Sequence, residues 1–187
     1  QKYAEAGMPV DLDMMFKGFM DAVKGQSLMG KDESTNLIRS SQSSFQARKE
    51  QNRKATLATA GKEGLDFLKQ NSSKSGVISL PSGLQYLVLS EGNGSKPKST
   101  DRVKVHYAGT LINGSEFDSS YKRNSPAEFP LNGVISGWTE GLQLMATGSK
   151  YKFFIPPNLA YGSKAVSIIP ANSTLIFEVE LLEIIGK

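Results

Sequence analysis

Few side chains in this sequence could carry out nucleophilic or metal-assisted chemistry. The 187 residues contain no cysteine and one histidine, His106. A serine triad needs a histidine beside its nucleophile, and common zinc sites need several His or Cys ligands. The lack of cysteine also excludes disulfides and thiol chemistry. We therefore expect no metal and no cofactor, and a site that binds or that catalyses a reaction without a nucleophile.

Two further candidates for chemistry have simpler interpretations. Residues 91–95 are rich in glycine but lack the lysine and following helix of a phosphate loop, so we interpret them as a turn. His106 alternates with Val105 and Tyr107, which predicts an exposed strand residue. A cation site made of carboxylates stays open as an alternative, but the Asp and Glu residues do not have the spacing of an EF-hand.

The composition is that of a globular protein. Hydrophobic residues make up 39% of the chain, and the net charge of +4 is spread without a block of like charges. We interpret these charges as a solvated surface and expect no nucleic-acid partner. No apolar run approaches the roughly 18 to 20 residues of a membrane helix. Because the chain begins with Gln1 rather than Met, we expect that a signal peptide, more protein or a cloning boundary precedes it.

The first part of the chain has a helical texture. Apolar residues at i, i+3 and i+4 spacing predict a helix whose apolar face needs a partner, and they are Leu12, Met15, Phe16, Phe19 and Val23. A second helix is predicted over residues 32–70, with a polar middle that is typical of a spacer. The alternative is two shorter helices, because Gly61 and Gly64 weaken a helix interior.

A polar stretch at residues 71–76 marks a domain boundary, and beyond it the hydrophobic period changes from helix to strand. Residues 102–107 and 177–181 alternate as half-buried strands do, and residues 84–88 and 151–155 do so more weakly. We predict a helical N-terminal region at residues 1–75 and a second domain at residues 76–187.

Local signals complete the fold prediction for the second domain. Asn113-Gly114 indicates a hairpin with a type I′ turn, in which both residues have positive φ. Residues 137–147 have a helical face, with Ser136 as a plausible cap. An antiparallel sheet with one short helix laid on it is an α+β fold.

Five motifs follow one another in this domain. They are Val105-His106-Tyr107-Ala108-Gly109-Thr110-Leu111, Gly114 to Phe117-Asp118-Ser119-Ser120, Val134-Ile135-Ser136-Gly137-Trp138, Ile155-Pro156 to Leu159-Ala160-Tyr161-Gly162, and Ile169-Pro170-Ala171-Asn172-Ser173-Thr174-Leu175 to Phe177. In this order they resemble the FKBP-type peptidyl-prolyl cis/trans isomerases over residues 80–185. The resemblance implies an FKBP-like antiparallel sheet wrapped on a short helix.

The resemblance also implies a proline pocket, with Trp138 at its floor. The implied catalytic residues are Tyr107, Phe117, Asp118, Tyr161 and Phe177. The implied substrate- and macrolide-binding residues are Phe129, Val134, Ile135, Trp138 and Ile169. The chain departs from better-known members at Ala127, where they carry an aromatic residue, and at residues 163–167, a shorter loop without their histidine. We expect both departures to affect the preference for the residue before proline and the affinity for macrolides.

The implied activity is rotation of X-Pro bonds during protein folding, by binding of the twisted amide in an apolar aromatic pocket. The implied partners are proline-containing polypeptides and macrolide inhibitors of the FK506 and rapamycin type. The alternative is a folding chaperone or proline-binding module in which turnover is incidental. Met14, Met15 and Met20 would offer it an adaptable apolar surface.

The helical region resembles that of the bacterial Mip-like (macrophage infectivity potentiator-like) branch, on residues 17–22 and the junction at residues 80–86. This implies homodimerisation through the N-terminal helices, joined to the catalytic domain by a long helix. We expect the first helix of that module to be mostly absent, with residues 1–6 as its tail. The branch implies a bacterial cell envelope, in the periplasm, with the cytoplasm as the alternative.

Overall fold

The computed structural model describes residues 12–25 and 30–186. The chain divides into two compact units, Gln1–Asn52 and Arg53–Lys187. This division falls inside a helix, earlier than the predicted domain boundary at residue 75, which marks the change from helix to strands. The predicted helical tail at residues 1–6 lies outside the described residues. No helix in the described ranges is long and apolar enough to cross a membrane.

Two helices precede the sheet. Helix α1 spans Leu12–Val23 and is followed by Gly25, whose φ of +70° suits the end of a helix. Helix α2 spans Lys31–Asn71 and continues through Gly61 and Gly64, so the prediction of one long helix is confirmed and two shorter helices are not formed.

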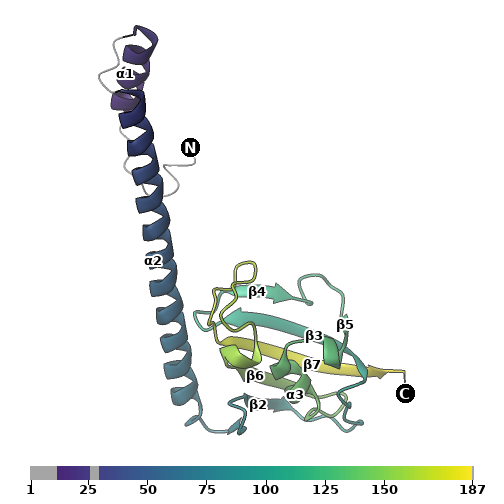
Figure 1. Cartoon of the computed structure of the whole chain (residues 1–187). Coiled ribbons are helices and arrows are strands. Elements are labelled where there is room, and N and C mark those ends of the chain that lie inside the picture. The colour runs from purple at the N-terminus through teal and green to yellow at the C-terminus, as the bar shows by residue number, and fades with distance from the viewer. Residues whose placement is uncertain (1–11, 26–29, 187) are drawn as a thin grey trace. The chain divides into compact units, whose positions relative to one another are not determined.

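An antiparallel sheet is the framework of the second unit (Figure 1). Its strand order is β1-β2-β6-β7-β3-β4, and β5 also pairs with β3. The strands are β1 Val77–Ser79, β2 Gln85–Ser90, β3 Arg102–Leu111, β4 Glu116–Ser119, β5 Ala127–Pro130, β6 Lys150–Ile155 and β7 Leu175–Ile185. The alternation predicted for β3 is confirmed, because Val103, Val105 and Tyr107 are buried between less buried neighbours.

One short helix packs against this sheet. Helix α3 spans Ser136–Leu142, between the short 3-10 helices η1 (Leu131–Gly133) and η2 (Pro157–Leu159). It comes close to β6 because Gly137 and Gly141 carry no side chain: a Cβ there would lie 2.5 Å from Ile155 and 2.6 Å from Phe153. The α+β fold class is therefore confirmed, with the helix laid on the sheet (Figure 1).

Four local predictions need correction. Helix α3 ends at Leu142 rather than near residue 147, and Ser136 is its first residue rather than its cap. The predicted hairpin forms, but Asn113 is not among the described residues with positive φ, so its turn is not type I′. The Gly114 amide donates to Leu111 and Gly114 has a φ of +84°, which gives a type I turn followed by a left-handed glycine. His106 is half-buried rather than exposed, because its ring stacks on Tyr121.

Candidate functional site

A single pocket of about 440 Å³ collects every residue that the sequence assigned to the proline site. The lining residues come from β3, β4, β5, α3, β7 and the segments beside them. They are Tyr107, Phe117, Asp118, Phe129, Gly133, Val134, Ile135, Trp138, Tyr161, Val166, Ser167, Ile169 and Phe177. Gly133, Val166 and Ser167 were not predicted. They neighbour predicted residues in the chain, and that proximity was the available signal.

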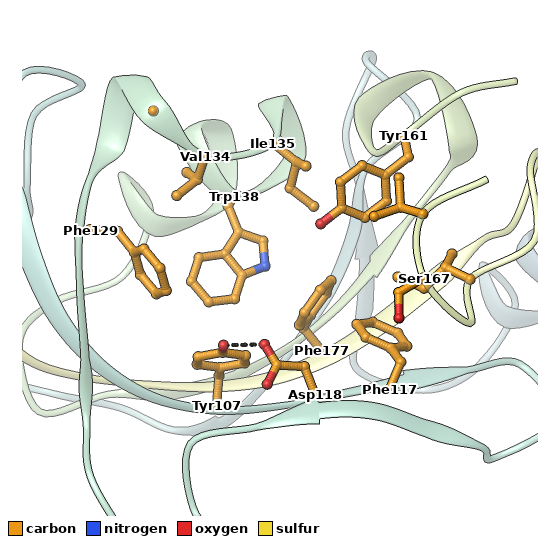
Figure 2. A pocket seen from close by; sticks show the side chains of 13 residues that line it. Tyr107, Phe117, Asp118, Phe129, Val134, Ile135, Trp138, Tyr161, Ser167 and Phe177 are labelled. Carbon is orange, nitrogen blue, oxygen red and sulfur yellow. Dashed lines mark hydrogen bonds between the residues drawn. The ribbon is translucent and has the colours of Figure 1, made fainter. Parts of the chain in front are cut away.

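Aromatic rings form the apolar interior of the pocket (Figure 2). The Trp138 side chain is only 4% exposed and lies between the other rings. Its ring meets those of Tyr107, Phe177 and Phe129 edge-on, with centroid distances of 5.1, 5.2 and 5.7 Å. Edge-to-face contacts of this kind favour a fixed ring arrangement. The cavity is therefore pre-formed to receive an apolar ring.

Strand pairing explains why residues distant in sequence meet here. Tyr107 lies on β3, and Gly109 on the same strand pairs with Phe177 of β7. A Cβ at Gly109 would lie 2.6 Å from the Phe117 ring and 2.7 Å from the Phe177 ring. Only glycine leaves room for both rings, which themselves pack edge-on at 5.4 Å.

A polar cluster occupies one wall. The Tyr107 hydroxyl donates a short hydrogen bond to Asp118 (Figure 2), and Arg123 forms an ion pair with the other oxygen of that carboxylate. The Arg123 guanidinium also donates to the Tyr107 hydroxyl at 2.9 Å and lies 5.6 Å from the centre of its ring. Arg123 was missed at the sequence level, because no periodic pattern links the turn that carries it to the strands.

The charges in this cluster determine which groups are ionised. Burial raises the pKa of the Asp118 carboxyl, but hydrogen bonds from Tyr107 and Arg123 outweigh it and hold the pKa below its ordinary value. Burial, followed by the hydrogen bond to Asp118, raises the pKa of the Tyr107 hydroxyl. At neutral pH the cluster therefore holds an ionised Asp118 and a protonated Tyr107, which donates to it.

The Ile135 amide and the Tyr161 hydroxyl are among the groups at the pocket that remain available to a ligand's carbonyl oxygens. Among the described residues, no backbone carbonyl accepts a hydrogen bond from the Ile135 amide, which lies just before α3. The Tyr161 side chain is 37% exposed at the rim, where Figure 2 shows its hydroxyl directed toward the cavity. Within the described ranges, no group of three or more His, Asp or Glu residues could hold a metal ion. The site can bind an apolar ring and orient carbonyls.

Comparison with protein families gives two matches that together span nearly the whole chain. Residues 93–182 match the model of the FKBP-type peptidyl-prolyl cis-trans isomerase. Residues 1–88 match the model of the domain amino terminal to FKBP-type peptidyl-prolyl isomerase.

Individual relatives agree with this. An FKBP-type peptidyl-prolyl cis-trans isomerase, FkpA, from Aeromonas hydrophila is 44% identical over 184 residues, which cover 98% of this chain and 69% of the relative. The outer membrane protein MIP of Legionella longbeachae is 39% identical, with 98% of this chain and 80% of the relative covered. The crystal structure of FkpA from Escherichia coli matches with a TM-score of 0.86 and 38% identity, and the match covers 98% of this chain and 86% of that one.

Proposed function

The chain belongs to the FKBP-type peptidyl-prolyl cis-trans isomerases, which accelerate rotation about X-Pro bonds, and we propose that it does so in the pocket floored by Trp138. The observation that carries this proposal is the convergence of all the residues implied by the family motifs on one apolar cavity.

The physics of the reaction suits such a cavity. Rotation about a peptide bond faces a barrier of about 18 to 20 kcal/mol, because the C–N bond has partial double-bond character. The twisted amide loses this conjugation, so its carbonyl is less polar than in the planar state. A pocket lined with aromatic rings that excludes water therefore binds the twisted state better than the planar state, which is the requirement for catalysis.

The polar groups have separable roles in this proposal. The Ile135 amide fixes one substrate carbonyl, and the Tyr161 hydroxyl donates to another. When it is ionised, Asp118 can only accept hydrogen bonds, so it cannot donate one to a carbonyl oxygen. Its contacts instead favour the role of holding Tyr107 and Arg123 in place at the pocket wall.

The test is the isomerisation rate of a short Leu-Pro peptide with the full chain. A thousandfold acceleration corresponds to only about 4 kcal/mol, so a few contacts suffice and each is measurable. We expect Asp118→Ala combined with Tyr161→Phe to lower kcat/KM at least tenfold, whereas Lys122→Gln, which breaks an exposed pair with Glu116, leaves it unchanged. We expect a macrolide of the FK506 or rapamycin type to inhibit the reaction by occupying the cavity. Full activity of the double variant would place the reaction elsewhere.

The N-terminal region supports a second proposal, homodimerisation. Phe16, Phe19 and Val23 on α1 are between 64% and 67% exposed, an apolar face of the kind that marks an interaction site. We propose that residues 1–75 act as the dimerisation and linker region and that residues 76–187 form the catalytic domain. Sedimentation analysis of the full chain tests the dimer, and a concentration-independent monomer would refute it.

The same apolar face supports the alternative function, a folding chaperone. Exposed Phe16 and Phe19 offer a surface for unfolded chains, while the side chains of Met14 and Met15 lie outside those described. Suppression of aggregation of an unfolded protein without prolines, measured with and without Phe16→Ser and Phe19→Ser, separates chaperone action from turnover.

We propose that the chain works in the bacterial cell envelope, in the periplasm, with the cytoplasm as the alternative. The support is one relative's name, an outer membrane protein. Cell fractionation with compartment markers decides between the two.

A further inference from the structure

The last turns of α2 pack against the loop that carries one wall of the pocket, residues 161–174, hereafter the pocket loop. Gly64 is buried, and a Cβ built on it would lie 2.4 Å from the Thr174 Oγ1 and 3.2 Å from the Thr174 Cβ. One turn earlier, a Cβ on Gly61 would lie 3.5 Å from the Asn172 Cβ. The helix backbone therefore rests on the base of the loop at Gly64 with no space for a side chain.

The pocket loop is closed on itself by backbone hydrogen bonds. The Asn172 amide donates to Gly162 at 2.7 Å, and Val166 and Ile169 exchange hydrogen bonds at 3.0 and 2.9 Å. Val166 and Ile169 line the pocket. The Ser173 hydroxyl donates to the Pro170 carbonyl at 2.7 Å, which ties the base of the loop to the residue that follows Ile169. A displacement at Asn172 or Thr174 therefore also displaces the wall.

The helix end is fixed independently of this loop. The Gln85 side chain of β2 donates to the Leu68 carbonyl at 2.9 Å, and the Asn71 side chain donates to Gln85 at 3.0 Å. The Phe67 and Phe154 rings lie 6.0 Å apart. Held on the sheet in this way, α2 cannot simply move away from a bulkier residue at position 64, so the loop must yield.

We propose that Gly64 and Thr174 are positioning residues for the isomerase, and that the end of α2 sets the position of the Val166–Ile169 wall and with it the preference for the residue before proline. The inference rests on the proposed site. The burial of Thr174 supports a packing role. The residue is only 1% exposed, and its hydroxyl makes no hydrogen bond among the described residues. The linking helix is then a structural part of the active site rather than only a spacer.

A matched pair of glycine substitutions in the full chain tests the proposal. Gly64→Ala and Gly61→Ala make the same change in the same helix and gain the same helix propensity, but only the first forces a clash. We expect Gly64→Ala to lower kcat/KM for a Leu-Pro peptide about tenfold and to change the ratio of Leu-Pro to Ala-Pro turnover, since small displacements are costly in catalysis. We expect Gly61→Ala to leave both within about twofold, because its contact is an ordinary one.

Rescue at Thr174 distinguishes positioning from general destabilisation. Adding Thr174→Ala to Gly64→Ala removes the clashing hydroxyl and should restore most of the activity and the normal turnover ratio, while Thr174→Ser, which keeps the hydroxyl, should restore less. This graded series also applies if Gly64→Ala alone is too unstable to assay. Thermal melting of each variant gives the folded fraction.

Two outcomes overturn the inference. One is a Gly64→Ala variant with normal kcat/KM and an unchanged turnover ratio. The other is an activity loss that Thr174→Ala does not relieve or that only follows the folded fraction. Failure of the proposed site is distinct from both, because Asp118→Ala with Tyr161→Phe would then keep full activity whatever the glycine variants do.

Discussion

Helix α2 has two different environments along its length. The side chains of residues 39–44 are exposed and Phe45 is half-buried, whereas Gly64, Leu68 and Asn71 near the end of the helix are buried. In a folded protein, a helix draws most of its stability from the packing of its side chains rather than from helix propensity. The end of α2 has that packing within the second unit. Residues 39–44 have no comparable burial. Equivalent substitutions in the two environments should therefore change the free energy of unfolding by very different amounts.

The largest difference is expected between two leucines of this helix. Leu68 is 7% exposed and Leu65 is 63% exposed. Leu68→Ala should lower the free energy of unfolding by about 2 to 4 kcal/mol, because it removes buried methyl groups and leaves a cavity. Leu65→Ala should change it by less than about 0.5 kcal/mol. Urea denaturation of the full chain measures both, and equal effects would mean that the end of α2 is not packed on the sheet.

The next largest effect on the free energy of unfolding is expected at the buried side-chain amide of Asn71. Asn71 is 1% exposed and donates to Gln85, which in turn donates to the Leu68 carbonyl. Asn71→Ala leaves the Gln85 oxygen buried without this donor and should cost about 1 to 3 kcal/mol of unfolding free energy. The exposed neighbour Gln70→Ala is the control and should be nearly neutral. A neutral Asn71→Ala would show that water replaces the lost donor.

The fold was predictable from the sequence where the signals are local. Alternation located β3 and β7, and the spacing of apolar residues located α1, because side-chain period follows directly from backbone geometry. The docking of Leu68 and Asn71 was not predictable, since it depends on β2 and β6 coming together beneath the helix. The turn at Asn113 was misjudged because the Asn113 side chain accepts a hydrogen bond from the Ser115 amide, which stabilises a type I turn with a following glycine.

The site divides in the same way. Motifs supplied the aromatic residues of the pocket, and strand pairing such as Gly109 with Phe177 brought them together. Arg123 was not predictable, because its contact with Tyr107 spans two elements and depends on the turn after β4. Gly64 was considered only as a weak point of a helix, although its lack of a side chain permits the contact with Thr174.

Substitution of Arg123 should have a smaller effect, because its polar contacts are half-exposed whereas the residues above are buried. Its ion pair with Asp118 has side chains 49% and 40% exposed, so water screens it. We expect Arg123→Gln to lower kcat/KM about threefold, through looser positioning of Tyr107. The adjacent Lys122→Gln is the control and should have no effect.

The pH dependence of this variant tests the same contact. Burial opposes ionisation of Asp118, but Tyr107 and Arg123 together hold the pKa of its carboxyl below the ordinary value. The stability that ionised Asp118 contributes to the folded protein is therefore present above its unfolded-state pKa. It is lost as pH falls through the folded-state pKa. Removing Arg123 raises the folded-state pKa, so the acid limb of the kcat/KM profile should move to higher pH. An unmoved acid limb would show that Arg123 does not govern the ionisation of Asp118.

The smallest effect on turnover is expected from a substitution in helix α1. Phe19 is 64% exposed on α1 and contributes nothing to the pocket lining, so Phe19→Asp should leave kcat/KM for a short Leu-Pro peptide within about 1.5-fold of the parent. The same change places a charge on the apolar face proposed for dimerisation and should shift the chain to a monomer in sedimentation, because an unpaired charge is costly to bury in an interface. Lys17→Gln, an exposed change on the same helix, controls for lost helix charge. A large fall in short-peptide turnover with Phe19→Asp would mean that helix α1 acts on the pocket itself. The packed end of α2 and the exposed helical segments before it could then no longer be assigned separately to catalysis and to assembly.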